Sequence, residues 1–587
     1  MDQTVVTKRS FSWNWKLTVA AVAVVVALAG LWYYLSLPSL TDTVAFPYIA
    51  HQKPVVDPHL PSSNAMADKL DDVLFDGLFN LTATPSGVVF TDGLGEFAGI
   101  DNNIVTVRLK SGRFWHDSYA ATADGKKVTI DKKTSHEFTA KDLAFTLKRI
   151  QDLGSLSPDY ILLAQALPVF EFEGPNERNE VRFKFRSDRT WIESDIKEVL
   201  SFKILPDNAS MSAVSYNIGT TPYMSVPDYE NTIRFRRTPD GDAKISAVQL
   251  VPFVDNSTFT TELRNGSINV LLEPPFGSIS PLLTEPGKFF VKSNVSSTFF
   301  AVLFNTARLN RQQRTEFRKL LDNRAIINRF FKVGTGQQRH TLDFKGNYDR
   351  YGDYVNDAVF PTSSYYVQEN IVQRYRDSTE SNLSILPDTL RIRACVNYGY
   401  REEYTDLIDI LNDPSITRGR VRAAAVQNDD IKRGDYDALL LAVSGYRSNF
   451  LFDLYNLFLR EPDLELYRIH LLTSTDSKGE QQIDPASFQA DRNFFRLDPT
   501  LNADERNDIQ ALLEDIYGFM STRHVGDKQA YAQRVADREH DMALGAWLFS
   551  LPSIAYFSSQ FDSSSIDMYG VASQLSTLKQ WKEMPKK

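Results

Sequence analysis

The feature that most constrains this chain is an uncharged apolar stretch near its amino terminus. Residues Leu17 to Leu37 read LTVAAVAVVVALAGLWYYLSL and contain no charged side chain. A stretch of about 21 such residues is long enough for a helix to cross a hydrocarbon layer roughly 30 Å thick. We therefore predict a transmembrane anchor over residues 17–37.

The charges on either side of this stretch predict its orientation. Lys8, Arg9 and Lys16 precede it, whereas the next basic residue after it is Lys53. Positive charge is retained on the cytoplasmic side of membrane segments, so residues 1–16 are expected to form a cytoplasmic tail. The prediction is a single-pass protein of the inner (cytoplasmic) membrane whose main domain is periplasmic or otherwise extracytoplasmic.

A cleaved secretory signal is the alternative interpretation of the same stretch. Ala27-Leu28-Ala29 resembles a signal-peptidase site after a short apolar run. We favour the anchor because the apolar character continues from Leu31 to Leu37, which is unusual for a signal peptide. The single cysteine, Cys395, lies far from this stretch, so lipid attachment there, disulfides within the chain and cysteine zinc sites are all excluded.

Charge and motif content exclude several classes of function. The chain has 65 Lys and Arg against 74 Asp and Glu, a net charge of −9, and no long basic run. Nucleic acid is therefore not expected as a partner. The sequence also lacks GxxxxGK[ST], HExxH and GxSxG motifs, so we predict no enzymatic activity, no metal and no cofactor.

Apolar periodicity predicts strands and helices that alternate along the rest of the chain. Residues 41–61 are expected to be a Pro-rich linker that enters a first strand. Strands are predicted at 44–48, 104–110 and 245–251, and helices at 64–79, after a Thr139 cap, and at 258–268, 314–331, 501–522 and 527–544. The predicted class is α/β or α+β with mixed sheets.

Seven stretches, taken in order, resemble one known family. They are DPHLPSSNAMADKLDDVLFDGLF, VTVRLKSGRFWHD, FTAKDLAFTLKRI, IGTTPY, LRNGSINVLLEP, FNTARLNRQQRTEFRKLLDNRAIINRFFKVGTG and GDYDALLLAVSGY, and they extend from Asp57 to Tyr446. Together they resemble the extracytoplasmic solute-binding proteins of the oligopeptide, dipeptide and nickel type (family 5), which serve ABC importers. The resemblance covers the chain from about residue 44 onwards.

This resemblance implies an α/β, two-lobed, periplasmic-binding-protein-like fold with mixed sheets and an extra third lobe. A solute would be held in the cleft between two lobes that crossover strands connect. The implied boundaries are 38–75, 216–299 and 541–587 for lobe I, 76–215 for the extra lobe and 300–540 for lobe II.

The resemblance also locates the solute site, at the end of the strand in GDYDALLLAVSGY. In peptide binders of the family, an aspartate there meets the α-ammonium of the ligand. In this chain that position carries Gly445, and the family's tryptophan position carries Ala442. The predicted solute-binding residues are Val443, Ser444, Gly445, Tyr446, Arg447 and Asn449.

The missing carboxylate leaves two functions open. In the first, the chain captures an oligopeptide or another extended polar solute for the permease subunits of an ABC importer. The backbone of Val443 and Ser444 could pair with such a chain, and Arg447 could contact an anionic group or simply lie on the surface. In the second, it is a scaffold or regulatory subunit with a vestigial cleft, bound to another envelope membrane protein. We favour the first.

A second departure from the family is the longer link between His116 and Phe138, SYAATADGKKVTIDKKTSHE. It could form a basic hairpin for a protein partner, although a solvated turn is the ordinary outcome. His116 and Asp117 are expected to form a structural turn rather than an acid–base pair, because no nucleophile or second acid accompanies them.

Overall fold

The computed structural model describes residues 40–61, 65–84, 87–187, 191–272, 287–330, 332–333, 337–338, 354–360, 375, 380–394, 396, 401–443, 454, 456–463, 468–477, 481–522, 525–567 and 575–585. The predicted anchor over 17–37 and Cys395 lie outside these ranges. Within them, none of the helices combines the length and the apolar character needed to cross a bilayer.

Lobe I is built on a four-stranded sheet in the order β1-β12-β11-β10. β1 is parallel to β12, and the other neighbours are antiparallel. The elements are β1 (Thr43–Ile49), β10 (Tyr223–Tyr229), β11 (Thr232–Arg237), β12 (Ala247–Phe253), α2 (Ala65–Leu74) and α6 (Phe259–Asn265). β1 is apolar and almost entirely buried, and its Phe46 shares a core with Trp581 from the last described segment of the chain.

The extra lobe has its own sheet and core. Its sheet has the order β4-β5-β9-β8, beside the hairpin of β2 and β3. The elements are β2 (Phe79–Thr84), β3 (Gly87–Asp92), β4 (Gly95–Asp101), β5 (Ile104–Leu109), β8 (Phe172–Glu173), β9 (Glu180–Lys184), α3 (Ala140–Leu153), α4 (Pro158–Ala166) and α5 (Glu193–Val199). Along β5, Val105, Val107 and Leu109 are buried while the intervening residues are not, as expected for a strand with one covered face.

Lobe II contains most of a six-stranded sheet in the order β13-β22-β14-β19-β17-β18. Its strands are β13 (Val270–Leu272), β14 (Phe289–Phe304), β17 (Leu390–Ala394), β18 (Val421–Ala425), β19 (Ala438–Val443) and β22 (Gly545–Ser558). Helices are α8 (Arg311–Leu320), α9 (Asn323–Phe330), α11 (Arg401–Asn412), α12 (Pro414–Thr417), α13 (Asn428–Lys432), α15 (Arg506–Ser521) and α16 (Val525–Met542). Two short pairs, β15–β16 (332–333, 337–338) and β20–β21 (473–475, 481–483), lie in the same part of the chain.

Both faces of this sheet are buried. Along β14, Phe300, Val302 and Phe304 belong to one apolar cluster. Phe299 and Leu303 belong to another cluster, on the opposite face. Successive side chains of a strand point to opposite faces, so a sheet covered by helices on both sides requires this continuous apolar run.

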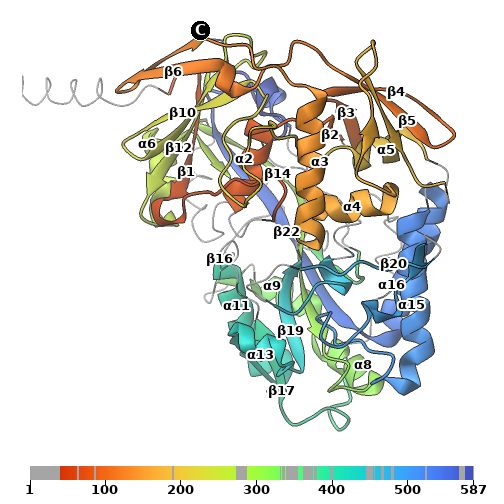
Figure 1. The fold of residues 1–587 in the computed structure, drawn as a ribbon. Helices are drawn as coiled ribbons and strands as arrows, with labels where there is room; N and C mark the ends of the chain where they lie inside the picture. Colours follow the sequence, from red (N-terminus) through yellow and green to blue (C-terminus); the bar gives the residue numbers. More distant parts are fainter. Residues whose placement is uncertain are drawn as a thin grey trace, which may run out of the picture.

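Two long strands pass from lobe I to lobe II. β14 and β22 are antiparallel neighbours, and their pairing shifts register between Val295 and Phe299. The last part of β22 contributes Phe557 to the lobe I core, whereas its first part contributes Leu548 to the lobe II core. In Figure 1, β14 and β22 run from the upper left of the molecule into its lower part.

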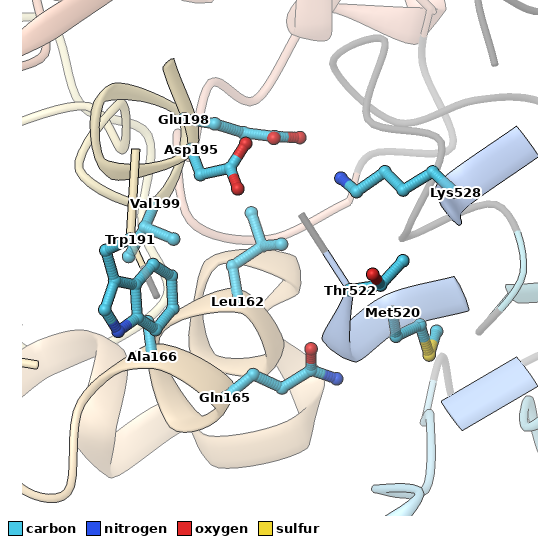
Figure 2. A pocket seen from close by; sticks show the side chains of 10 residues that line it. All are labelled: Leu162, Gln165, Ala166, Trp191, Asp195, Glu198, Val199, Met520, Thr522 and Lys528. Atoms are coloured by element: carbon cyan, nitrogen blue, oxygen red, sulfur yellow. The ribbon is translucent and has the colours of Figure 1, made fainter. Parts of the chain in front are cut away.

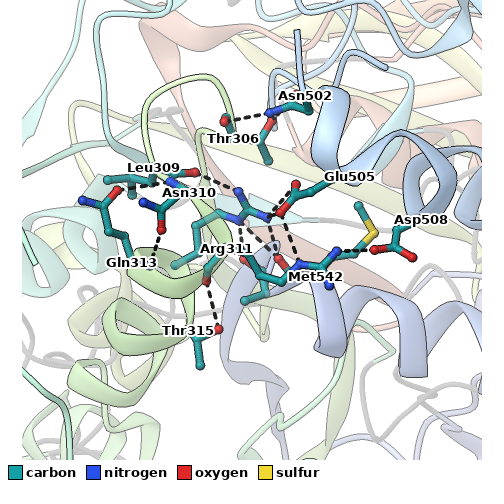
Figure 3. Close-up of polar contacts among 12 residues, drawn as sticks. Thr306, Leu309, Asn310, Arg311, Gln313, Thr315, Asn502, Glu505, Asp508 and Met542 are labelled. Atoms are coloured by element: carbon teal, nitrogen blue, oxygen red, sulfur yellow. Dashed lines mark hydrogen bonds and ion pairs between the residues drawn. The ribbon is translucent and has the colours of Figure 1, made fainter. Parts of the chain in front are cut away.

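A buried arginine fixes the start of β22 in lobe II. Arg314 of α8 is fully buried and donates hydrogen bonds to Glu505 (2.7 and 2.9 Å) and to the carbonyl oxygen of Met542 (2.8 Å). Arg311 also pairs with Glu505 and with Asp508 (Figure 3). Met542, just before β22, is thereby bonded to α8, and α8 is in turn bonded to α15.

Lobe I and the extra lobe are joined by hydrogen bonds between His116 and Gly219. The backbone N–H of His116 donates to the Gly219 carbonyl oxygen (2.9 Å), and the Gly219 N–H donates to His116 Nδ1 (3.0 Å). His116 Nε2 donates to the Thr221 carbonyl oxygen (2.9 Å). A Cβ at position 219 would lie 1.6 Å from the Leu74 carbonyl oxygen, so only glycine fits there. His116 and Asp117 lie in a short 3-10 turn.

Most predicted elements are present, with two corrections. The helix predicted over 64–79 ends at Leu74, because Gly77 is already paired with Lys203 in a β-bridge. For 314–331 a single long helix or a helix pair was expected; the structure has the pair, and it begins earlier than predicted, at Arg311, where Asn310 and Gln313 form a capping box. The Thr139 cap of α3 is present as predicted.

The longer link after His116 forms a hairpin of β6 (Tyr119–Asp124) and β7 (Lys127–Lys132). It is fastened to lobe I, because Arg234 donates to the carbonyl oxygen of Gly125 (3.0 Å) and Lys132 pairs with Asp240 (3.0 Å). Nothing in these contacts tests whether the hairpin binds a partner.

Candidate functional site

β19 ends at the boundary between lobe I and lobe II. Val443 is its last residue and is 1% exposed. It pairs with Phe299 of β14, directly beside the register shift at which β14 leaves lobe I. The segment that begins at residue 444 therefore starts at the interlobe boundary.

Of the six predicted solute-binding residues, only Val443 is described. Ser444, Gly445, Tyr446, Arg447 and Asn449 lie outside the described residues, so their roles stay predictions. Val443 points into an apolar cluster of lobe II, which leaves its backbone rather than its side chain for contact with a solute.

A tyrosine supports the end of β19. Among the described residues, β17 pairs with β19 as far as Leu440. Beyond that point the Ala442 N–H donates to the hydroxyl of Tyr404 (2.7 Å), a residue of α11 that is fully buried. The Tyr404 ring also lies edge-on to Phe300, with centroids 5.4 Å apart. Tyr404 thus supports the end of β19 next to the predicted site.

A buried glutamate supports the other side of the same boundary. Glu539 of α16 is 1% exposed and accepts hydrogen bonds from Trp547 Nε1 (2.7 Å) and the Gly545 N–H (3.2 Å). The Trp547 ring contacts Phe299, with centroids 6.1 Å apart. Burial raises the pKa of Glu539 to about 7, against the opposing effects of the Arg318 charge and these hydrogen bonds.

The extra lobe also contacts lobe II directly. Ile161 of α4 is 1% exposed and belongs to an apolar cluster that otherwise consists of lobe II residues. Beside it lies a pocket with about 30 Å³ of space for water (Figure 2). The pocket is lined by Leu162, Gln165, Ala166, Trp191, Asp195, Glu198 and Val199 from the extra lobe and by Met520, Thr522 and Lys528 from lobe II.

Charged side chains meet across this pocket. Lys528 of α16 is 7% exposed and extends toward Asp195 and Glu198 of α5 (Figure 2). Burial raises the pKa of Glu198, the positive charge of Lys528 lowers it, and the negative charge of Asp195 raises it. The contact between the extra lobe and lobe II therefore contains both apolar groups and half-buried charges.

One group of side chains has the geometry of a metal site. The ligand atoms of His136, Asp142 and Asp207 lie within 4.8 Å of one another. Asp142, however, accepts hydrogen bonds from the backbone N–H groups of Thr139 (2.7 Å) and Asp207 (2.8 Å). His136 Nδ1 is bonded to Asp117 (2.9 Å). These contacts account for the arrangement through the helix cap, so we assign no metal to it.

Sequence reasoning missed the supporting residues on both sides of the boundary. Tyr404, Glu539 and Lys528 lie on helices and show no motif. Tyr404 and Lys528 act through residues far away in the chain, such as Ala442 for Tyr404, so no local pattern could have identified them. Glu539 bonds to Gly545 and Trp547, six and eight residues further on, and its burial depends on the fold around it.

Residues 98–374 match the model of the bacterial extracellular solute-binding proteins, family 5 Middle, which confirms the resemblance found in the sequence. No curated protein matches the chain.

Solved structures show the same fold. NikA from Brucella suis in complex with Fe(III)-EDTA is 12% identical, with a TM-score of 0.64 over 92% of this chain and 100% of that one. The oligopeptide-binding protein AppA from Bacillus subtilis, in complex with a nonapeptide, is 12% identical, with a TM-score of 0.58 over 92% and 99%. AgaA from A. tumefaciens R10 in complex with agropinic acid is 14% identical, with a TM-score of 0.61 over 93% and 99%. The predicted mixed α/β fold is thereby confirmed.

Proposed function

Taking the chain as a family 5 solute-binding protein, we propose that it is a membrane-anchored receptor that captures an oligopeptide-like solute for an ABC importer. Residues 17–37 hold it in the inner membrane, residues 1–16 are cytoplasmic, and the rest is extracytoplasmic. The lobe limits given from the sequence belong to this proposal. Its protein partners are the permease subunits of the importer, and it carries out no chemistry.

The observation that carries the proposal is the position of β19. Val443 ends this strand at the interlobe boundary, next to the crossing strands β14 and β22. A solute held there would touch both lobes, and a ligand that contacts both lobes favours the arrangement in which they are close together. The complexes of similar fold support this role, because AppA from Bacillus subtilis holds a nonapeptide.

The chemistry of the solute follows from the residues after β19. Gly445 offers no carboxylate, so the site does not select a free α-ammonium group by an ion pair. The backbone of Val443 and Ser444 pairs with an extended chain, Tyr446 and Asn449 offer polar contacts, and Arg447 suits an anionic group. We therefore propose an extended polar solute whose amino terminus is not its main determinant.

Thermal melting tests solute binding directly. The full chain in detergent is melted with pools of peptides and with the same pools after amino-terminal acetylation. A solute at 100 times its dissociation constant adds about 2.7 kcal/mol to stability. Equal shifts with free and acetylated pools are expected. Gly445→Asp, which restores a carboxylate, is expected to favour the free peptides over the acetylated ones.

The alternative function is a scaffold or regulatory subunit of an envelope membrane complex. The specific observation that favours it is Gly445 in place of the family's acidic residue. No melting shift with any pool, together with recovery of a stable membrane protein partner, would replace the receptor proposal by this one. Neighbouring reading frames for an ABC permease and ATPase would argue for the receptor.

A further inference from the structure

The extra lobe is attached to lobe I by two largely buried ion pairs in addition to backbone hydrogen bonds. Arg149 of α3 is fully buried and pairs with Asp57 of lobe I (2.7 Å). Lys203 of the extra lobe pairs with Asp72 of α2 (2.8 Å). Separating a buried ion pair leaves a charge without its partner, which is strongly unfavourable. Lobe I and the extra lobe are therefore expected to move together as one body.

This body can touch lobe II through the extra lobe only when lobe I and lobe II are close together. Ile161 of α4 then lies in an apolar cluster of lobe II. Lys528 of α16 extends toward Asp195 and Glu198 of α5 (Figure 2). We call these four residues the closing contact, because their arrangement requires the closed lobes.

One helix joins the closing contact to the boundary at which the predicted solute site begins. Lys528 lies near the beginning of α16. Glu539 lies roughly 16 Å further along the helix and accepts a hydrogen bond from Trp547 Nε1 (2.7 Å). The Trp547 ring contacts Phe299, which pairs with Val443 at the end of β19. α16 therefore extends from the closing contact to the support of the strand that the solute site follows.

α16 is held against α15 in a tightly packed pair of helices. A Cβ at Gly518 of α15 would lie 2.0 Å from the ring of Tyr531, so the two helices approach as closely as glycine allows. Asp515 of α15 accepts hydrogen bonds from Arg534 (2.9 Å) and Arg538 of α16. Close-packed elements transmit strain and compress little. A displacement at one end of α16 is therefore expected to reach its other end.

From these observations we propose that the closing contact holds the lobes together over the solute site and that α16 couples this contact to the end of β19. Ile161 and Lys528 are then positioning residues for solute binding, which act on the site through α16. A solute at the end of β19 and the closing contact both favour the closed arrangement, so each strengthens the other by the same factor. This inference rests on the proposed function, since it takes the solute site to lie at the end of β19.

Distances between spin labels test the closing contact without any solute. The full chain in detergent, with Cys395→Ala, carries labels at Val254→Cys in lobe I and Leu501→Cys in lobe II, positions that are 83% and 63% exposed. Ile161→Glu places a charge in the apolar cluster of lobe II, so the lobes should move apart and the distance between the labels should increase. The control Val169→Glu changes a 54% exposed valine of the extra lobe and should leave the distance unchanged.

A charge exchange separates the contact itself from a general effect on folding. Lys528→Glu should lengthen the distance between the labels, and adding Glu198→Lys should restore it, because opposite charges face each other again. Thermal melting verifies that each variant is folded. If Ile161→Glu does not fold, Lys528→Glu and the double variant carry the test alone. Folded variants that keep the parent's distance overturn the closing contact, and so does a double variant that stays open.

Hydrogen exchange tests the coupling through α16. Lys528→Glu should accelerate exchange several-fold at the amides of Val443 and Gly545, which lie beyond the far end of the helix, while β5 of the extra lobe keeps its protection. A longer distance between the labels with unchanged exchange at these two amides would leave the closing contact in place and overturn the coupling.

The solute itself provides the last arm, which separates this inference from the proposed function. Peptide pools that shift the melting of the parent should give a smaller shift with Ile161→Glu at the same concentration and the full shift with Val169→Glu. Equal shifts for the parent and Ile161→Glu would overturn the link between the closing contact and solute binding. If no pool shifts the parent, the proposed function fails, whereas the label distances still decide whether the closing contact exists.

Discussion

Lobe II has two boundaries of very different construction. Its boundary with lobe I is made by β14 and β22, whose backbones continue through both lobes and whose side chains are buried in both cores. Its boundary with the extra lobe is made by side chains alone, namely Ile161, the lining of a small pocket, and Lys528 opposite Asp195 and Glu198. The first boundary can bend but cannot separate without unfolding, whereas the second can separate while each lobe stays intact. We infer that opening of the molecule would take place at the second.

The largest expected effect comes from breaking the attachment of β22. Arg314→Ala leaves Glu505 buried without its main partner and removes the hydrogen bonds to residues 542 and 543. Losing one partner of a buried ion pair costs about 3–5 kcal/mol, and we expect a loss of that size in the free energy of unfolding by denaturant. Arg311→Ala, at a 40% exposed partner of the same glutamate, serves as the control and should cost less than about 1 kcal/mol. Similar losses for both variants would refute the role given to Arg314.

The next-largest effect is a dependence of stability on pH, caused by Glu539 at the boundary between lobe I and lobe II. The pKa of Glu539 is raised to about 7 in the folded protein from its ordinary value of 4.5. A carboxyl group whose pKa is higher in the folded protein than in the unfolded chain contributes stability that is fully present below pH 4.5 and is lost as the pH rises through about 7. The full contribution is about 3 kcal/mol. Denaturant midpoints between pH 5 and 8 should therefore fall with rising pH, and Glu539→Gln should flatten this dependence. An unchanged slope in the variant would assign the dependence to other groups.

A smaller effect is expected when the hydrogen bond that supports the end of β19 is removed. Tyr404→Phe removes the hydroxyl that accepts from the Ala442 N–H and leaves that buried N–H without a partner, which costs about 1–3 kcal/mol. Hydrogen exchange should accelerate at the Ala442 amide, while amides in β17 keep their protection. Faster exchange throughout the sheet would mean that Tyr404 stabilises lobe II as a whole and not the strand end beside the predicted site.

The smallest effect on stability is expected from a change at the boundary between lobe II and the extra lobe. This change is the most informative one for comparing the two boundaries of lobe II. Lys528→Glu places three carboxylates around one pocket, so the extra lobe and lobe II should move apart. Spin labels at Ile192→Cys and Ala530→Cys, in a Cys395→Ala background, should report a longer distance.

The matched control for that experiment is Lys141→Glu, which has the same charge change on an exposed part of α3. It should leave the distance between the labels unchanged. An unfolding free energy within about 1 kcal/mol of the parent is expected for both variants, because the carboxylates of Lys528→Glu become solvated once the extra lobe and lobe II move apart, and solvent-exposed charges contribute little to global stability. A large loss of stability in Lys528→Glu would mean that this boundary, too, is part of one core.

The sequence predicted elements whose signals are local. The alternation in β5, the Thr139 cap and the apolar run of β19 are each visible within a few residues. The start of α8 could also have been placed correctly, since Asn310 and Gln313 have the spacing of a capping box. The end of α2 could not, because Gly77 pairs with Lys203, far along the chain. A tertiary contact there overrides a helical apolar pattern.

The candidate site, too, has a part that the sequence could predict and a part that only the folded structure reveals. The resemblance predicted a solute site at the end of β19, and of the six residues predicted there the structure describes Val443, which pairs with Phe299 of β14. Tyr404 and Lys528 were not predictable, because each becomes significant only when a distant segment is folded against it. Glu539 bonds to Gly545 and Trp547, six and eight residues further on, but that spacing does not reveal that its carboxyl group is buried. Burial, which determines the pKa of Glu539, is a property of the assembled lobe.

The position of β22 in the sheet also bears on how the protein is made. β22 lies between β13 and β14, although it is the last of the described strands. Until residues 545–558 have been synthesised, the sheet has an empty slot lined by unpaired backbone and apolar side chains. Domains generally fold as units during synthesis, so the nascent chain must be kept from aggregating until nearly its whole length is available. A chain that ends before residue 545 would lack β22 and would keep only β14 of the two long strands that pass between its lobes.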